Sequence, residues 1–152
     1  MKFNSQICTT KEQSERLLAL GLKKETADMC INISHESELV YSFSYSEALS
    51  LYHNYGLDRI TNTDSLLPAW SLHRLIKMMP EWISYPTQWG SAPLRINKDS
   101  MYYVHRFFDR NGDEDTSTVG DDEAIGSHNI YDYAVSVIGF LIREGHFNEE
   151  FI

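Results

Sequence analysis

Four oxygen-bearing side chains occupy every second position of one short segment: Asp109, Asn111, Asp113 and Asp115. Oxygen ligands at this spacing are typical of a calcium-binding loop. With Asp109 as the first position, however, the sixth is Glu114 and the twelfth is Gly120, where such loops carry glycine and a bidentate glutamate. The segment before it also has the pattern of a strand, not of a helix. We therefore expect a solvated loop between a strand and a helix, and no metal site.

Histidines and nucleophiles offer little further chemistry. The six histidines lack the spacing of a zinc site. His105 stands out because it lies in a mostly apolar segment, although a satisfied half-buried histidine is the simpler interpretation. The sequence contains no phosphate loop, dinucleotide fingerprint, nucleophile elbow, zinc-protease helix or thiol redox pair. It therefore favours a non-catalytic role over an enzyme, and it predicts no cofactor.

Aromatic side chains supply a different class of candidate site. The segment 81–93 has no regular period and contains Trp82, Tyr85 and Trp89, and Trp70 precedes it. Such rings form the hot spots of protein interfaces, and they also serve as lids over a hydrophobic core. The candidate binding residues are Trp70, Trp82, Tyr85, Trp89 and His105.

Composition and charge limit the kinds of partner. The chain has 152 residues, 42% of them hydrophobic, which suits a single globular domain over residues 1–152. Its net charge of −9 argues against direct nucleic-acid binding, because phosphate contacts require clustered lysine and arginine. Seven acids and one arginine between Asp109 and Glu123 account for −6 of that charge. The start of the chain lacks the apolar run of a signal peptide, so we expect a cytoplasmic protein with buried, reduced Cys8 and Cys30.

The sequence predicts several helices that would position these residues, and capping residues mark where these helices begin or end. The last one, about 130–144, is apolar on nearly all sides, with Asn129 or Ser127 as its cap and Gly145 at its end. It is too short to span a membrane. Capping boxes also predict helices after Thr9 or Thr10 and after Ser44. Another is expected from Pro68 or Ser71 to Pro80.

Strands are predicted from apolar residues at every second position. Ile31 and Ile33 mark one strand, and Tyr41 to Tyr45 marks another. The segments 94–96 and 101–108, joined by 97–100, predict a hairpin whose second strand is central in its sheet. The expected fold is therefore α+β, with a small, mainly antiparallel sheet packed against N-terminal, central and C-terminal helices. A helix-turn-helix over 11–29 is a weaker alternative, because Glu25 and Asp28 offset the charges of Lys23 and Lys24.

Several landmarks together resemble a known family. They are Glu12-Gln-Ser-Glu-Arg-Leu-Leu-Ala-Leu-Gly-Leu22, Thr26-Ala-Asp-Met29, Leu67-Pro-Ala-Trp-Ser-Leu72, the hairpin, and Asp132-Tyr-Ala with Leu141-Ile-Arg-Glu-Gly145. They cover roughly half of the chain and resemble a family of small uncharacterised proteins of Bacteroides-type gut bacteria, often carried on prophages or other mobile elements. The resemblance implies a phage or mobile-element setting and brings no activity, cofactor or catalytic residue.

These observations lead to one main expectation and two alternatives. The main one is a non-catalytic accessory protein of a phage or mobile element that binds another protein, or a second copy of itself, through an aromatic surface. An acidic mimic of nucleic acid that occupies a DNA-binding protein is the first alternative. The second is a small-molecule binder or enzyme with an aromatic cleft near His105. No membrane partner is expected.

Overall fold

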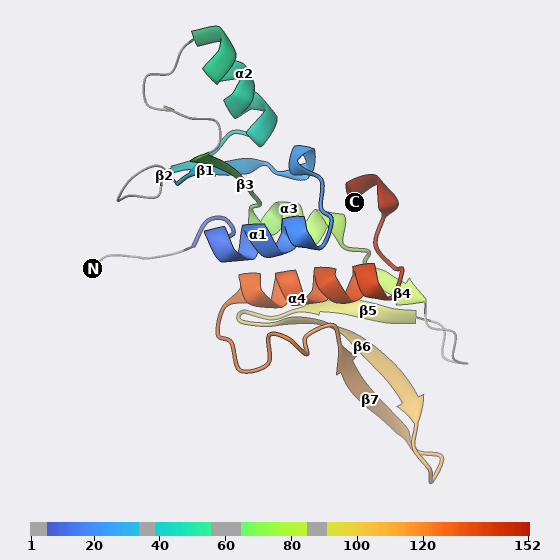
Figure 1. Cartoon of the computed structure of the whole chain (residues 1–152). Helices are drawn as coiled ribbons and strands as arrows, with labels where there is room; N and C mark the ends of the chain where they lie inside the picture. The colour runs from blue at the N-terminus through green and yellow to red at the C-terminus, as the bar shows by residue number, and fades with distance from the viewer. Residues whose placement is uncertain (1–5, 34–38, 56–64, 85–90) are drawn as a thin grey trace. The chain divides into compact units, whose positions relative to one another are not determined.

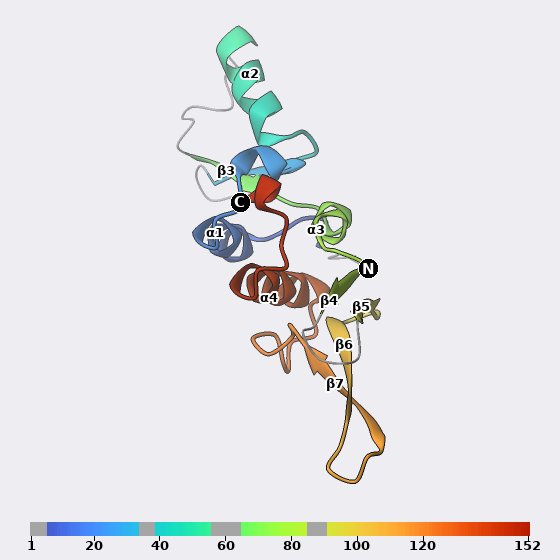
Figure 2. The same cartoon turned by 90° about the vertical axis from the view of Figure 1, so that its right-hand side faces the viewer.

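The described part of the chain, residues 6–33, 39–55, 65–84 and 91–152 of a computed structural model, has an α+β fold. The α+β class and the N-terminal, central and C-terminal helices are as the sequence predicts (Figures 1 and 2). The strands form two antiparallel sheets, whereas the sequence predicts one. The chain divides into unit 1, Met1–Ile76 with Glu150–Ile152, and unit 2, Lys77–Glu149. A single domain over the whole chain stays a prediction.

Unit 1 is built on a three-stranded sheet. Its central strand β1 (Met29–Asn32) pairs antiparallel with β2 (Leu39–Tyr41) and with β3 (Leu66–Ala69). Cys30 packs on one face of β1 against Ala48 of helix α2 (Tyr45–Tyr55), whereas Ile31 packs on the other face with Cys8 and Ala69. Both cysteines are buried free thiols, as expected. Because both faces are covered, β1 is apolar at consecutive positions.

Strand β3 corrects one prediction from the sequence. A helix is expected to begin at Pro68 or at Ser71; the first alternative is wrong, because Leu66–Ala69 is a strand, and the second is confirmed. Pro68 is tolerated there because β3 is at the edge of the sheet, where a missing N–H removes no hydrogen bond to an outer neighbour. Helix α3 (Leu72–Met78) begins after Ser71, whose hydroxyl accepts a hydrogen bond from the Arg74 amide at 3.1 Å.

Two helices of unit 1 begin with capping boxes. Helix α1 (Lys11–Ala19) is capped by Thr10, which exchanges hydrogen bonds with Gln13, and α2 by Ser44, which does the same with Glu47. After α1, residues 24–26 form only a 3-10 turn, and β1 follows directly. The described residues 6–33 therefore contain no helix-turn-helix, because the chain enters the sheet where a second helix would be needed.

Unit 2 contains a four-stranded antiparallel sheet in the order β4-β5-β6-β7. Its strands are β4 (Trp82–Ser84), β5 (Ser91–Ile96), β6 (Met101–Phe108) and β7 (Glu114–Val119). The predicted β5–β6 hairpin and the central place of β6 are confirmed. Pairing of β5 with β6 ends at Leu94, and the next residue outward, Pro93, has no N–H to extend it.

Strand β7 corrects a second prediction. Residues 109–123 were expected to be one solvated loop, but Glu114–Val119 pairs with β6 from Tyr103 to Phe108. The segment has β-forming residues at Thr116, Thr118 and Val119. The stabilisation from its six cross-strand pairs with β6 outweighs the low strand propensity of the acidic residues at its start.

Helix α4 (Ile130–Arg143) covers one face of this sheet (Figures 1 and 2). The Asn129 side chain caps it by accepting the Tyr131 N–H at 2.9 Å, and Gly145 ends it with a φ of 72°. Its interior is buried on nearly all sides from Ala134 to Leu141, as predicted. Ser136, in the middle of this stretch, donates to the Gly120 carbonyl oxygen at 2.8 Å. No helix in the described part of the chain is long and apolar enough to cross a membrane.

Candidate interaction surface

The two faces of the sheet in unit 2 differ sharply in burial. Ile83, Ala92, Met101 and Tyr103 point to the face that α4 covers, and each is at most 2% exposed. Residues between them along the strands point the other way, because side chains alternate in a strand. The opposite surface is here named the outer face. In the described residues it consists of Trp82, Ser84, Ser91, Pro93, Arg95, Tyr102, Val104, Arg106, Phe108, Glu114, Thr116 and Thr118.

Trp82 is the most exposed aromatic ring of this outer face. It lies on the edge strand β4, is directly opposite Pro93, and is 61% exposed. Phe108, at the far end of β6, is 43% exposed. Tyr102 is half-buried, and the Asn97 side chain donates to its hydroxyl at 3.0 Å. Because Asn97 is itself bonded to Ser100 in the β5–β6 turn, the Tyr102 ring is held in place.

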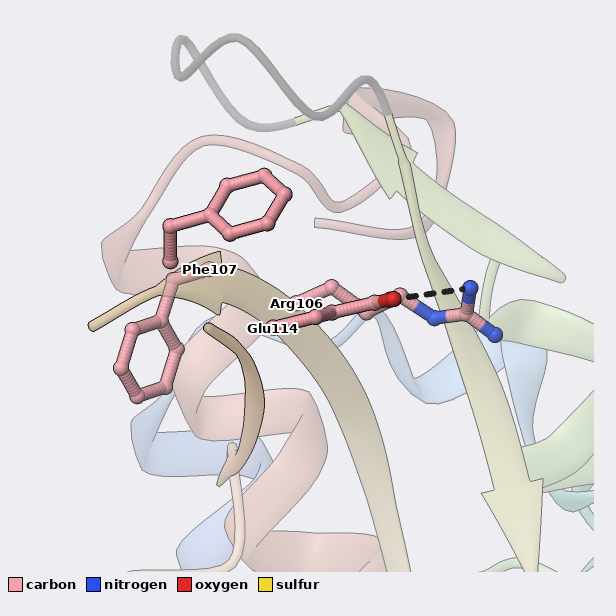
Figure 3. Close-up of a pocket in the computed structure, with 4 residues that line it drawn as sticks. Arg106, Phe107 and Glu114 are labelled. Atoms are coloured by element: carbon pink, nitrogen blue, oxygen red, sulfur yellow. Dashed lines mark hydrogen bonds and ion pairs between the residues drawn. The ribbon is translucent and has the colours of Figure 1, made fainter. Parts of the chain in front are cut away.

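The outer face carries two arginines, Arg95 and Arg106, and one acid, Glu114, whereas the protein as a whole is acidic. Arg106 forms an ion pair with Glu114 at 3.4 Å, with both side chains more than half exposed (Figure 3). Such a pair contributes about 0–1 kcal/mol to stability. Arg95 lies opposite Tyr102 and makes no ion pair with any residue that the structure describes.

A small pocket lies at the end of this surface. Its lining comes from Arg106, Phe107, Phe108 and Glu114, and its volume is about 230 Å³. Figure 3 shows Arg106 and Glu114 reaching toward each other while the Phe107 ring points to another side of the strand. Small-molecule sites usually have roughly 300–1,000 Å³ and bury most of their ligand. The pocket therefore suits one apolar side chain of a partner better than a cofactor.

His105 is on the other side of the sheet from Trp82. The register puts His105 on the same face as Tyr103 and Ile83, where its ring stacks on Phe107 with centroids 6.2 Å apart. The strands thus separate these two predicted site residues. The predicted cleft that would join them also includes Tyr85 and Trp89, which lie outside the described residues.

Trp70 belongs to unit 1, where it is fully buried. Its indole N–H donates to the Thr26 hydroxyl at 2.9 Å, and its backbone N–H donates to the Thr9 hydroxyl at 3.0 Å. Nearby, Ser71 bonds to the Asp28 carboxylate through both its amide and its hydroxyl. The segments Thr26–Met29 and Leu67–Leu72 therefore meet in one hydrogen-bonded network. Trp70 fills the core of unit 1 in this arrangement.

The acidic segment begins with a tight turn between β6 and β7. The Asp109 carboxylate accepts the backbone N–H groups of Asp113 at 2.9 Å and Asn111 at 2.8 Å, which lowers its pKa below the usual value. Asp109 is thereby used to close the hairpin, with Gly112 at a φ of 86°. Within the described ranges, no group of three acidic, histidine or cysteine side chains is arranged to hold a metal ion.

Arg95, Tyr102 and Phe108 were not among the residues predicted from the sequence. Their signal was present in the alternation of β5 and β6, in which the buried Ala92, Met101 and Tyr103 and the half-buried Leu94 mark one face. Strand β6 was instead interpreted as apolar on both faces, because Val104 and Phe108 are apolar residues on its outer face. Separating the two faces of β6 requires its pairing with β5 and β7.

Comparisons with known proteins assign no family to this chain. The sequence matches no protein-family model and no curated protein, and the structure matches no solved structure. The resemblance to the proteins of Bacteroides-type bacteria therefore stays a prediction, and the function has to be argued from the surface itself.

Proposed function

We propose that this chain is a non-catalytic, cytoplasmic accessory protein of a phage or mobile element, and that it binds another protein through the outer face of unit 2. The observation that carries the proposal is the 61% exposure of Trp82 on that face. A tryptophan left in water forgoes the burial free energy of a large ring, whereas the same ring in an interface is among the most frequent hot-spot residues.

Neighbouring side chains support the same interpretation. Pro93 lies directly opposite Trp82, Val104 and Tyr102 are half-buried on the same face, and Phe108 is exposed at its end. Apolar side chains rimmed by polar ones, here the threonines of β7 and the two arginines, have the composition of a protein interface. The pocket at Phe108 adds a place for an anchoring side chain.

The two alternatives have less support. A mimic of nucleic acid presents its negative charges over one face, but Glu114 and Glu123 are engaged in ion pairs with Arg106 and Arg143. A cleft that uses both Trp82 and His105 is disfavoured by their positions on opposite faces of the sheet. We therefore propose neither as the function.

An affinity capture from host lysate tests the proposal. The bait variants are the wild type, Trp82→Ala, and Ile125→Ala as the matched control. Ile125 is 72% exposed and lies in unit 2 outside the sheet, so its truncation also removes exposed apolar surface. Circular dichroism and melting curves establish that the three proteins are equally folded.

A hot-spot tryptophan contributes about 2–4 kcal/mol to binding, so Trp82→Ala should weaken partner capture by roughly 30-fold or more. Ile125→Ala should capture the partner as the wild type does. If all three baits recover the same proteins in equal amounts, or if the wild type recovers no specific partner, Trp82 is not an interface residue and the proposal fails.

A further inference from the structure

Arg95 is placed among the rings of the outer face. It follows Pro93 by two residues on β5, so both side chains point to the same face about 6.6–6.8 Å apart along the strand. Pro93 is opposite Trp82, and Arg95 is opposite Tyr102. The guanidinium group therefore extends from a surface that has aromatic residues on both neighbouring strands.

The Arg95 guanidinium group has no ion-pair partner in the described part of unit 2. Arg106 on the same face is paired with Glu114, and Arg143 elsewhere in the unit is paired with Glu123. Arg95 is exposed, and its side chain forms neither a hydrogen bond nor an ion pair with the described residues. An unpaired cation is thus presented beside the exposed Trp82 and the half-buried Tyr102 in a protein with a net charge of −9.

We infer that the partner segment carries a carboxylate next to an apolar side chain. Arg95 binds the carboxylate, and Trp82 packs against the apolar side chain. The inference rests on the proposed function and names the chemistry of its partner. Guanidinium is planar and weakly hydrated, and it binds a carboxylate through two parallel hydrogen bonds. A nucleic-acid partner is disfavoured because phosphate backbones require clustered cations, and this face offers one unpaired arginine.

A random peptide library displayed on phage tests this chemistry without knowledge of the natural partner. The full-length protein is the bait, and Trp82→Ala serves as the counter-selection. Peptides that bind the wild type and are lost with Trp82→Ala should be enriched in Asp or Glu close to an apolar residue. Enrichment of Lys or Arg, or no charge preference, would overturn the inference while leaving an interface at Trp82 intact.

Affinities of one selected peptide then isolate Arg95. Replacement of its acid by the matching amide should weaken binding to the wild type about tenfold or more, because hydrogen bonds between charged groups are the strong ones. The variant Arg95→Gln should bind the acidic peptide as weakly and should no longer distinguish acid from amide. The control Arg110→Gln removes the same charge from the exposed hairpin turn and should still distinguish them.

Other outcomes each have a definite meaning. If Arg95→Gln still distinguishes acid from amide, Arg95 does not receive the carboxylate and the inference is wrong. If the wild type self-associates on size exclusion and Arg95→Gln abolishes this, the face binds a second copy of this chain, and the proposal that it binds another protein is wrong. If no peptide is enriched on the wild type over Trp82→Ala, the proposed function fails together with the inference.

Discussion

Substitution of Thr26 by valine should destabilise the protein through Trp70. The Thr26 hydroxyl accepts the indole N–H of the fully buried Trp70 and itself donates to the Lys23 carbonyl oxygen at 2.7 Å. Thr26→Val keeps the shape of the side chain but removes this acceptor, which leaves the indole N–H buried without a partner. The Lys23 carbonyl remains satisfied, because the Thr26 backbone N–H also donates to it.

The expected cost follows from that single unsatisfied group. A buried donor without a partner costs about 1–3 kcal/mol. With an m-value of about 2 kcal/mol per molar urea, a loss of 2 kcal/mol lowers the urea midpoint by about 1 M. Circular dichroism during a urea titration measures the shift. The control Thr118→Val, on the exposed face of β7, should change stability by no more than about 0.5 kcal/mol.

A double-mutant cycle assigns the effect to Trp70. In a Trp70→Phe background there is no indole N–H to satisfy, so Thr26→Val should cost about 1 kcal/mol less than in the wild type. A loss below about 0.5 kcal/mol for Thr26→Val alone, or equal losses in both backgrounds, would refute the hydrogen bond and with it the core position of Trp70.

Three further predictions concern backbone strain and titration. Gly120→Ala should lower the melting temperature of the protein more than Gly112→Ala does. Both glycines have a positive φ, but of the two only Gly120 would place a Cβ close to a side-chain atom, 3.3 Å away in Phe140. Equal losses of stability in the two variants would contradict this. The Asp109 carboxyl should titrate, as followed by carbon NMR, below its ordinary pKa of 3.8, because backbone N–H groups favour its charged form. The contribution of this carboxylate to stability is present above pH 3.8 and is lost as the pH falls through the folded pKa. A titration midpoint at or above 3.8 would contradict this prediction. Burial, with a smaller effect of Cys8, raises the pKa of the Cys30 thiol to about 11, so the contribution of this thiol to stability is present below its ordinary pKa of 9.0 and is lost toward pH 11. At pH 8 both buried thiols should therefore react with a disulfide reagent only in urea. Fast labelling of the folded protein would disprove this.

The sequence by itself determined where α1, α2 and α4 begin and where α4 ends. Thr10 with Gln13, Ser44 with Glu47, and Asn129 before α4 all act as predicted, as does the left-handed Gly145. These features depend on hydrogen bonds and steric limits within a few residues, so they can be recognised locally. The β5–β6 hairpin was predictable for the same reason, because its strands are adjacent in the chain.

Tertiary structure alone decided which strands pair and which face each side chain takes. Strand β3 finds its partner β1 more than thirty residues away, and β7 is a strand because β6 offers it six cross-strand pairs. Trp70 and Trp82 look alike in the sequence, but one fills a core and the other is exposed. A shift of register by one residue would exchange the two faces of a strand, and no local rule fixes that register. The separation of Trp82 from His105, and the place of Arg95 beside the rings, therefore arise only when the four strands of unit 2 assemble.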